Sequence, residues 1–131
     1  DNNSLYNSSI GKSKNIKTFI MDSSIVVGVG NIYASESLFL AGISPKRISG
    51  NTSKKRYVLL TKSIKNVLSD AINNGGTTLN DFSNVDGSPG YFSQVLNVYG
   101  RDNMPCIRCN VKIKRIIQNQ RATYYCPKCQ H

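Results

Sequence analysis

Four cysteines in the last 26 residues constrain the fold of this chain more than any other feature. They form two Cys-x-x-Cys pairs, Cys106 with Cys109 and Cys126 with Cys129, separated by 16 residues. Each pair can present two thiolates to one ion, and four sulfurs complete a tetrahedron with no open position. The spacing therefore predicts one structural Zn²⁺ site. Two disulfides or a redox pair are the alternatives, and the lack of a visible secretory signal or thioredoxin-like pattern disfavours both.

The segment between the two pairs has the pattern of a β-hairpin. Apolar and aromatic residues alternate on either side of a polar turn near residues 119–120. Arg121 is therefore expected near the hairpin tip, where a guanidinium can bind a phosphate through two hydrogen bonds. His131, the single histidine, stands at the end of the chain and is not expected to be a metal ligand.

The rest of the chain predicts a mainly α-helical fold. One helix is expected over residues 31–41, with Asn31 as its N-cap and Gly42 in the left-handed position that ends it. A longer helix is expected over residues 53–73, because apolar residues recur there every three or four positions. The segment 16–29 could be a short strand or the approach to a helix.

These elements divide the chain into three expected parts. Residues 1–15, rich in Asn and Ser, read as a polar tail or linker. Residues 16–100 form a helical domain with a helix–turn–helix-like pair, and residues 101–131 form the zinc finger.

Charge narrows the choice of partner. Seventeen Lys and Arg face seven Asp and Glu, which gives a formal net charge of +10. A polyanion is the expected partner, and nucleic acid is the first candidate because phosphate contacts release condensed counterions. A membrane surface is a weaker alternative, since the chain has no Trp. No stretch approaches the roughly 18 apolar residues of a membrane span.

Several apparent catalytic motifs fail. Gly11-Lys12-Ser13 resembles the end of a phosphate-binding loop, but Tyr6 stands where its first glycine belongs. Glu36, the single glutamate, falls within the first predicted helix, where a packing or surface role is favoured over a general acid. No nucleophile–base pair is visible, so on its own residues the chain reads as a binding module.

Several blocks of sequence resemble the formamidopyrimidine-DNA glycosylase family. Residues 26–36, Val-Val-Gly-Val-Gly-Asn-Ile-Tyr-Ala-Ser-Glu, resemble its helix–two-turn–helix signature. Gly-Gly-Thr-Thr-Leu at 75–79, Tyr-Gly-Arg at 99–101 and the block 120–126 follow in the family's order. The cysteine spacing also fits its zinc finger. The related endonuclease VIII branch fits less well, because of the block at 75–79 and the residues after it.

The resemblance implies a bifunctional glycosylase and lyase that excises oxidised purines such as 8-oxoguanine and formamidopyrimidines. The family flips the damaged nucleotide out of the duplex. Its N-terminal proline then forms a Schiff base with the sugar, with help from an adjacent Glu, and elimination cuts the strand. This chain lacks that proline, that Glu and their domain, so it is expected to be inactive alone.

Individual roles follow by the same resemblance. Asn31 would bind a phosphate near the lesion, which suits the positive end of a helix. Arg121 would grip phosphates beside the flipped sugar and act as proton donor in δ-elimination. Lys17 matches a lysine implicated near the damaged base, and Lys12 is a further phosphate candidate. Thr18 departs from the pattern, because proline often follows the family's lysine.

The resemblance also implies a lesion-capping loop over residues 80–90. Its expected members are Asn80, Asp81, Phe82, Gly87, Gly90 and the adjoining Tyr91. The acidic balance and Gly-Pro content suit a lid better than a phosphate contact. Asn80 replaces a residue that is basic in many relatives, which would weaken a backbone contact.

The sequence thus predicts a helix–two-turn–helix bundle followed by a β-hairpin, zinc-ribbon-like finger, both facing damaged double-stranded DNA. The expected state is a monomer, cytoplasmic and associated with a bacterial nucleoid, working with an N-terminal catalytic domain. The alternative is a zinc-ribbon nucleic-acid-binding protein without enzymatic activity. Higher affinity for a duplex with an abasic analogue would favour the repair enzyme.

Overall fold

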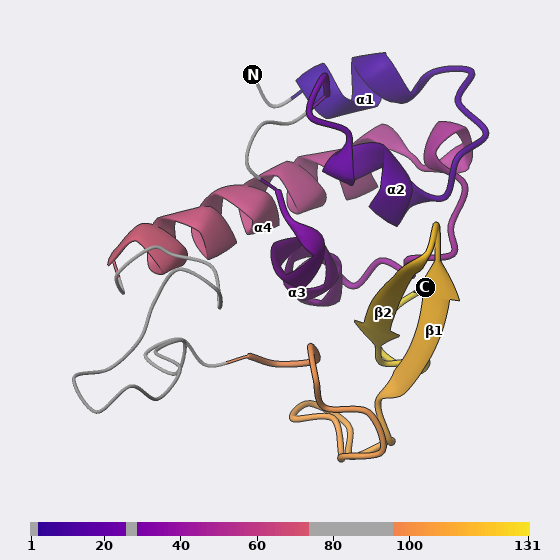
Figure 1. Ribbon diagram of the computed structural model, residues 1–131. Coiled ribbons are helices and arrows are strands. Elements are labelled where there is room, and N and C mark those ends of the chain that lie inside the picture. Colours follow the sequence, from indigo (N-terminus) through magenta and orange to yellow (C-terminus); the bar gives the residue numbers. More distant parts are fainter. Residues whose placement is uncertain (1–2, 26–28, 74–95) are drawn as a thin grey trace.

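The computed structural model describes residues 3–25, 29–73 and 96–131. Figure 1 shows helices grouped beside a two-stranded hairpin near the C-terminus. The elements in chain order are α1 (Ser4–Ser9), α2 (Ile16–Met21), α3 (Asn31–Ala41), a 3-10 turn (Ser49–Asn51), α4 (Lys54–Asn73), β1 (Lys114–Gln118) and β2 (Arg121–Tyr125). The predicted mainly α-helical fold with a hairpin is confirmed.

The long helix α4 forms where the apolar period predicted it. The residues that recur on its inner face are buried, namely Tyr57, Leu60, Ile64, Val67 and Ala71. Ser53 stands just before the helix, and its hydroxyl accepts a hydrogen bond from the Arg56 backbone N–H at 3.2 Å. The helix packs mainly against α3, so the two predicted helices are the central pair of the fold.

Helix α3 spans the predicted residues, Asn31–Ala41, and differs from the prediction only in its N-cap. Gly42 adopts a left-handed conformation with φ 73°, and its N–H donates to the carbonyls of Leu38 and Phe39. Gly30, not Asn31, is the N-cap, and Asn31 is the first helical residue. The Asn31 side chain makes no cap because it is hydrogen-bonded to other parts of the chain.

The segment whose polarity suggested a tail or linker contains a helix, α1, within its described residues 3–15. Helix α1 packs against α4. Leu5 is buried, and the ring of Tyr6 lies 6.2 Å from that of Tyr57. One apolar pair on an otherwise polar segment is too weak a pattern to predict a helix, yet it is enough to dock this short one.

The segment 16–29, for which the sequence left a strand or the approach to a helix open, begins with the helix α2. Asn15 caps it, because its Oδ1 accepts a hydrogen bond from the Thr18 N–H at 2.9 Å. Thr18 therefore uses an N–H that proline lacks. The departure from the family pattern is accommodated by this cap.

The hairpin has the predicted position. Strands β1 and β2 are antiparallel, with Gln118 opposite Arg121 beside the turn. The two turn residues, Asn119 and Gln120, have φ of 49° and 67°, as a tight hairpin turn requires. The first strand begins at Lys114, slightly later than the alternation around Ile113 suggested. Arg121 thus stands at the tip.

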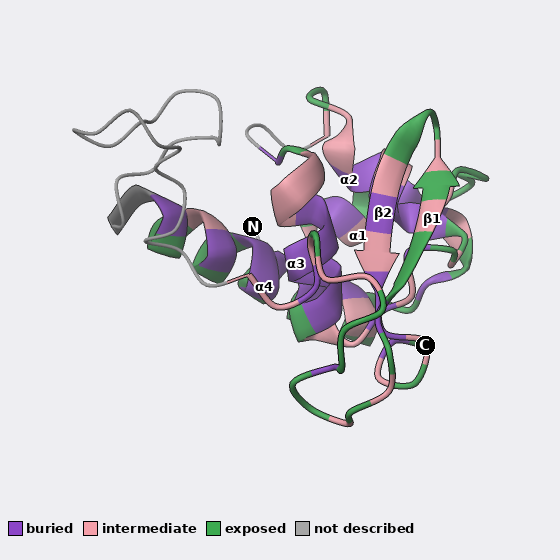
Figure 2. Cartoon of the chain, turned by 60° about the horizontal axis from the view of Figure 1, so that its bottom comes forward, coloured by how far each residue is buried: buried purple, intermediate pink, exposed green. Residues whose placement is uncertain are grey.

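The buried residues form two clusters that meet at α3 (Figure 2). The first lies among the helices and includes Leu38 of α3. The second joins Phe39 of the same helix to Val98, Ile113 and two of the cysteines. Among the described residues, no helix is long and apolar enough to cross a bilayer.

Candidate metal centre and nucleic-acid interface

The four cysteines converge as their spacing predicted. All four Sγ atoms lie within 4.8 Å of one another. The Cys106 and Cys129 sulfurs are 3.9 Å apart, and those of Cys109 and Cys126 are 3.4 Å apart. Four thiolates around one Zn²⁺ have sulfurs about 3.8 Å apart, given a zinc–sulfur bond of about 2.3 Å. The residues present therefore fit one structural zinc ion.

Backbone amides support the thiolates of this cluster. The Arg108 N–H donates to the Cys106 sulfur at 3.4 Å, and the Cys129 N–H donates to the Cys126 sulfur at 3.3 Å. A backbone hydrogen bond from Val111 lowers the pKa of the Cys109 thiol to about 7. These hydrogen bonds favour the deprotonated sulfur that a metal needs, whereas burial raises the pKa of the Cys126 and Cys129 thiols.

Gln130 ties the metal centre to the end of α3. Its side-chain Oε1 accepts a hydrogen bond from the Cys126 N–H at 2.7 Å. Its Nε2 donates to the Ile43 carbonyl at 2.9 Å, just beyond the helix. Because Gln130 is buried, both bonds are shielded from water, and the finger cannot move relative to α3 without breaking them.

Glu36 ties α3 to the segment that leads into the finger. Its carboxylate is buried, with 4% of the residue exposed. It accepts hydrogen bonds from three successive backbone N–H groups, those of Asn97 at 2.7 Å and of Val98 and Tyr99 at 2.9 Å each. The packing role that the sequence favoured is thus the observed one, and the three bonds compensate for burying the charge.

Lys17 lies at the junction of three elements. It belongs to α2 and is 1% exposed. Its ammonium donates to Asn31 Oδ1 at the start of α3, to Thr123 Oγ1 at 2.7 Å and to the Ala122 carbonyl at 3.3 Å, both on β2. Burial, and to a smaller extent the charge of Arg121, lowers its pKa from 10.5 to about 8.

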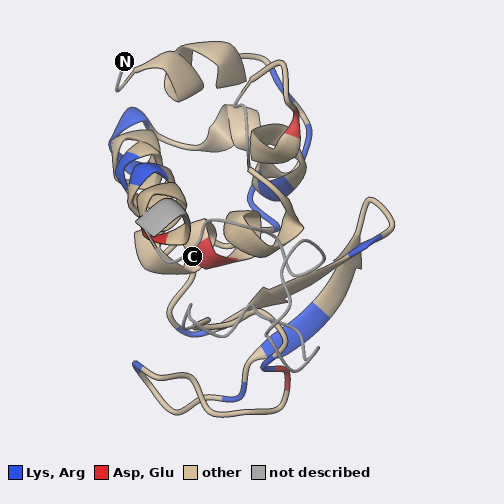
Figure 3. Ribbon diagram, turned by 60° about the vertical axis from the view of Figure 1, so that its left-hand side comes forward, with Lys and Arg blue, Asp and Glu red and all other residues tan. Residues whose placement is uncertain are grey.

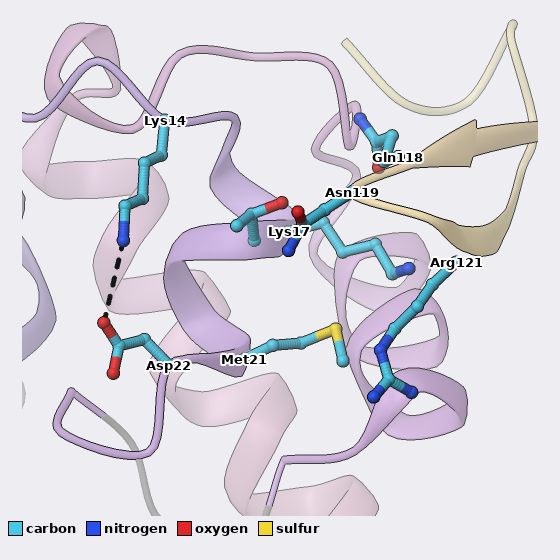
Figure 4. Close-up of a pocket in the computed structure, with 8 residues that line it drawn as sticks. Lys14, Lys17, Met21, Asp22, Gln118, Asn119 and Arg121 are labelled. Atoms are coloured by element: carbon cyan, nitrogen blue, oxygen red, sulfur yellow. Dashed lines mark ion pairs between the residues drawn. The ribbon is translucent and has the colours of Figure 1, made fainter.

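Asn31 and Arg121 lie on the same side of the molecule. The Asn31 side-chain amide donates to the carbonyl of Ala122, the residue after Arg121, at 3.0 Å. Arg121 also lines a cavity of about 300 Å³ together with Lys17. Figure 4 shows the Arg121 side chain beside the Lys17 ammonium. Asn31, at the positive end of α3, is thus bonded to the residue that follows Arg121 on β2.

The cavity also contains a lysine that the sequence did not single out. Its lining residues are Lys14, Lys17, Thr18, Met21, Asp22, Gln118, Asn119 and Arg121. Lys14 forms an ion pair with Asp22 at 3.8 Å (Figure 4). Lys12, the predicted phosphate candidate, is exposed and does not line this cavity. No local signal separates Lys14 from Lys12, since only the fold determines which of the two lines the cavity with Arg121.

The expected lesion-capping loop, Asn80, Asp81, Phe82, Gly87, Gly90 and Tyr91, lies outside the described residues. Within the described part, basic groups dominate. All 17 Lys and Arg belong to it, against Asp22, Glu36, Asp70 and Asp102. Figure 3 shows Lys and Arg along both the long helix and the hairpin. The positive charge thus extends over both halves of the fold.

Comparison with known families decides what these features belong to. Residues 1–83 match the model of the formamidopyrimidine-DNA glycosylase H2TH domain. Residues 105–131 match the zinc finger found in Fpg and isoleucyl-tRNA synthetase. The chain belongs to the formamidopyrimidine-DNA glycosylase family. The resemblance inferred from the sequence blocks is confirmed.

Relatives of the family align along nearly the whole chain. The formamidopyrimidine-DNA glycosylase of Ruthia magnifica is 62% identical over 130 residues, which are 99% of this chain and 48% of the relative. That of Alcanivorax borkumensis is 55% identical over 126 residues, 96% of this chain and 47% of the relative. The chain spans about half the length of the curated relatives it matches.

Solved structures of the family share the fold. The MutM (Fpg) protein of Thermus thermophilus superposes with a TM-score of 0.87 at 33% identity, over 99% of this chain and 50% of that one. Lactococcus lactis Fpg in complex with DNA containing an abasic site gives 0.86 at 34% identity, over 100% of this chain and 47% of that one. The arrangement of helices and finger is therefore that of the formamidopyrimidine-DNA glycosylases.

Proposed function

We propose that this chain is the DNA-binding part of a bifunctional DNA glycosylase and AP lyase that removes oxidised purines. The observation that carries the proposal is the hydrogen bond from the Asn31 side chain, at the start of α3, to Ala122, the residue that follows Arg121. A helix N-terminus, an amide and a guanidinium together suit a sugar–phosphate backbone. The complex of a relative with abasic-site DNA supports the same substrate class.

The phosphate would be held from two elements. Arg121 would grip it from the hairpin tip through its guanidinium. Asn31 would approach it with its backbone N–H and with the amide hydrogen near the Tyr99 hydroxyl, since the Asn31 Nδ2–Tyr99 Oη distance of 3.5 Å is a weak contact that a phosphate can replace. Lys12 would add a contact from the preceding loop, and residues 80–91 would cap the flipped base.

The chemistry requires residues that this chain does not contain. In the family's reaction, an N-terminal proline amine attacks the sugar and a neighbouring Glu acts as an acid. Arg121 would supply a proton to the leaving phosphate in δ-elimination, and Cys106, Cys109, Cys126 and Cys129 would hold the Zn²⁺ that keeps the finger folded. We expect the chain to bind damaged DNA as a monomer and to need the N-terminal catalytic domain for turnover, in the cytoplasm beside the nucleoid.

The test is a binding competition between two duplexes of the same sequence. One carries a tetrahydrofuran abasic analogue and the other is intact. We expect affinity at least tenfold higher for the first, measured by fluorescence anisotropy, and no strand cleavage by this chain alone. Equal affinity for the two duplexes would instead favour a zinc-ribbon module that binds nucleic acid without a repair function.

A further inference from the structure

The ammonium of Lys17 has no donor left for DNA. A lysine carries three N–H groups, and three acceptors of this chain surround the Nζ atom, namely Asn31 Oδ1, Thr123 Oγ1 and the Ala122 carbonyl. The residue is also 1% exposed. A direct contact with a phosphate or a base would therefore require breaking at least one of these bonds and exposing the side chain.

The three acceptors belong to the two elements of the proposed DNA site, the start of α3 and the strand β2, whose relative position matters for binding. Asn31 begins α3, and its Oδ1 faces the Lys17 ammonium. This orientation directs the Asn31 Nδ2 toward the Ala122 carbonyl and the Tyr99 hydroxyl. Ala122 and Thr123 follow Arg121 directly on β2. The buried ammonium of Lys17 thus fixes both the Asn31 side-chain amide and the strand β2, which carries the Arg121 guanidinium.

Burying the Lys17 ammonium at this position costs free energy. The Arg121 charge is close enough to help lower the pKa of Lys17, so the two positive groups repel each other. A buried ammonium is retained against this cost when its hydrogen bonds fix a specific arrangement. In this structure the Lys17 ammonium donates to both Asn31 Oδ1 and Thr123 Oγ1 and so links the start of α3 to β2.

We propose that Lys17 is a positioning residue for DNA binding, which holds Asn31 and Arg121 in register through its three hydrogen bonds and does not itself contact DNA. This inference rests on the proposed function for its readout in affinity. It differs from the role near the damaged base that the family resemblance implied for Lys17.

A double-mutant cycle separates positioning from direct contact. Lys17→Met keeps the length of the side chain and removes the donors. We expect it to weaken binding to the abasic-analogue duplex about tenfold. In an Asn31→Ala background the further loss should be threefold or less, because the amide that Lys17 orients is already gone. The slope of log affinity against log salt should stay at the wild-type value in Lys17→Met.

Three controls accompany the cycle. Lys14→Met removes an equal charge from the same cavity, and its effect should add fully to that of Asn31→Ala. Arg121→Ala should lower the salt slope by about one, as a lost phosphate contact does. Zinc content and melting temperature are measured for every variant. Additive losses for Lys17→Met and Asn31→Ala, with a salt slope lowered by about one, would overturn the positioning role.

Two further measurements keep the inference testable by other routes. If Lys17→Met does not fold, Thr123→Val removes one acceptor and leaves the charge, and undiminished affinity of that variant overturns the proposal. In the free protein, the side-chain amide of Asn31 is followed by NMR. We expect slow hydrogen exchange in the wild type and fast exchange in Lys17→Met, and identical exchange overturns the proposal. This readout decides the role of Lys17 even if the abasic duplex is not preferred.

Discussion

The carboxylate of Glu36 accepts a hydrogen bond from the backbone N–H of Val98, a residue 62 positions later in the chain. Because Glu36 belongs to α3 and Val98 packs with finger residues in the second buried cluster, this bond joins α3 to the segment that leads into the finger. The N–H groups on either side of Val98 bond to the same carboxylate. Long-range hydrogen bonds of this kind fix the position of the site residues, and removing them should have measurable consequences.

Replacing Glu36 by Gln should loosen the finger. The amide group of Gln turns a donor toward backbone N–H groups that need an acceptor, so at least one buried bond is lost. We expect the free energy of unfolding to fall by roughly 2–3 kcal/mol, as for a charge-assisted bond left unmade in a buried site. Urea denaturation measures it. Asp70→Asn, an exposed change on α4 with the same loss of charge, should cost less than about 1 kcal/mol; equal costs would argue against the Glu36 tie.

Replacing Cys106 by Ser should release zinc and unfold the finger while the helices persist. The buried residues of the first cluster all lie between Leu5 and Ile64, with no contribution from the finger, so their packing does not require the metal. Metal analysis should find less than one zinc per chain, and circular dichroism should retain most of the helical signal. One zinc per folded Cys106→Ser chain would show that the four-thiolate site is wrong.

The stability of the protein should rise with pH above about 8 because of Lys17. The folded state holds the pKa of Lys17 at about 8, whereas its ordinary value is 10.5. Between these two values the unfolded chain binds a proton that the folded chain has released, so the free energy of unfolding increases with pH. Below about 8 both states are protonated and the cost of burying the ammonium is fully present. The charged groups that face Lys17 here are Arg121 from β2 and the paired Lys14 and Asp22.

The check is a series of urea denaturations from about pH 7 to 10 on wild type and Lys17→Met. Other groups, including Tyr57, whose pKa burial raises, titrate in both proteins and cancel in the difference. The wild type should gain stability relative to the variant as pH rises. A constant difference over this range would show that the Lys17 pKa is not lowered.

Replacing Arg121 by Ala should weaken binding to abasic-analogue duplex by roughly tenfold to a hundredfold, since a bond to a charged phosphate contributes about 1.5–3 kcal/mol. The salt slope should fall by about one. Lys62→Gln, an exposed change on α4 outside the cavity, serves as the charge control and should leave the preference for abasic over intact duplex unchanged. An unaltered salt slope in Arg121→Ala would place this residue off the DNA.

Spacing predicted the parts of the structure that depend on local chemistry. The two Cys-x-x-Cys pairs specified the metal cluster, and the turn at 119–120 between alternating strands placed Arg121 at the tip. The apolar period specified α4 and its buried face. Each of these depends on a few neighbouring residues whose types allow one arrangement.

Long-range hydrogen bonds could not be predicted in this way. Nothing near Lys17 indicates that its partners lie on α3 and β2, 106 positions away in the case of Thr123. The helix α1 was missed because one buried Leu and one Tyr among polar residues give no periodic signal. Lys14 was passed over for Lys12 because two lysines in one loop differ only in the direction that the tertiary fold gives them.

Helix α3 contributes adjacent side chains, Leu38 and Phe39, to two different buried clusters. The helical bundle and the finger therefore share α3 as a common wall. A rotation of the finger relative to α3 would have to pull at least one of these two side chains out of its cluster.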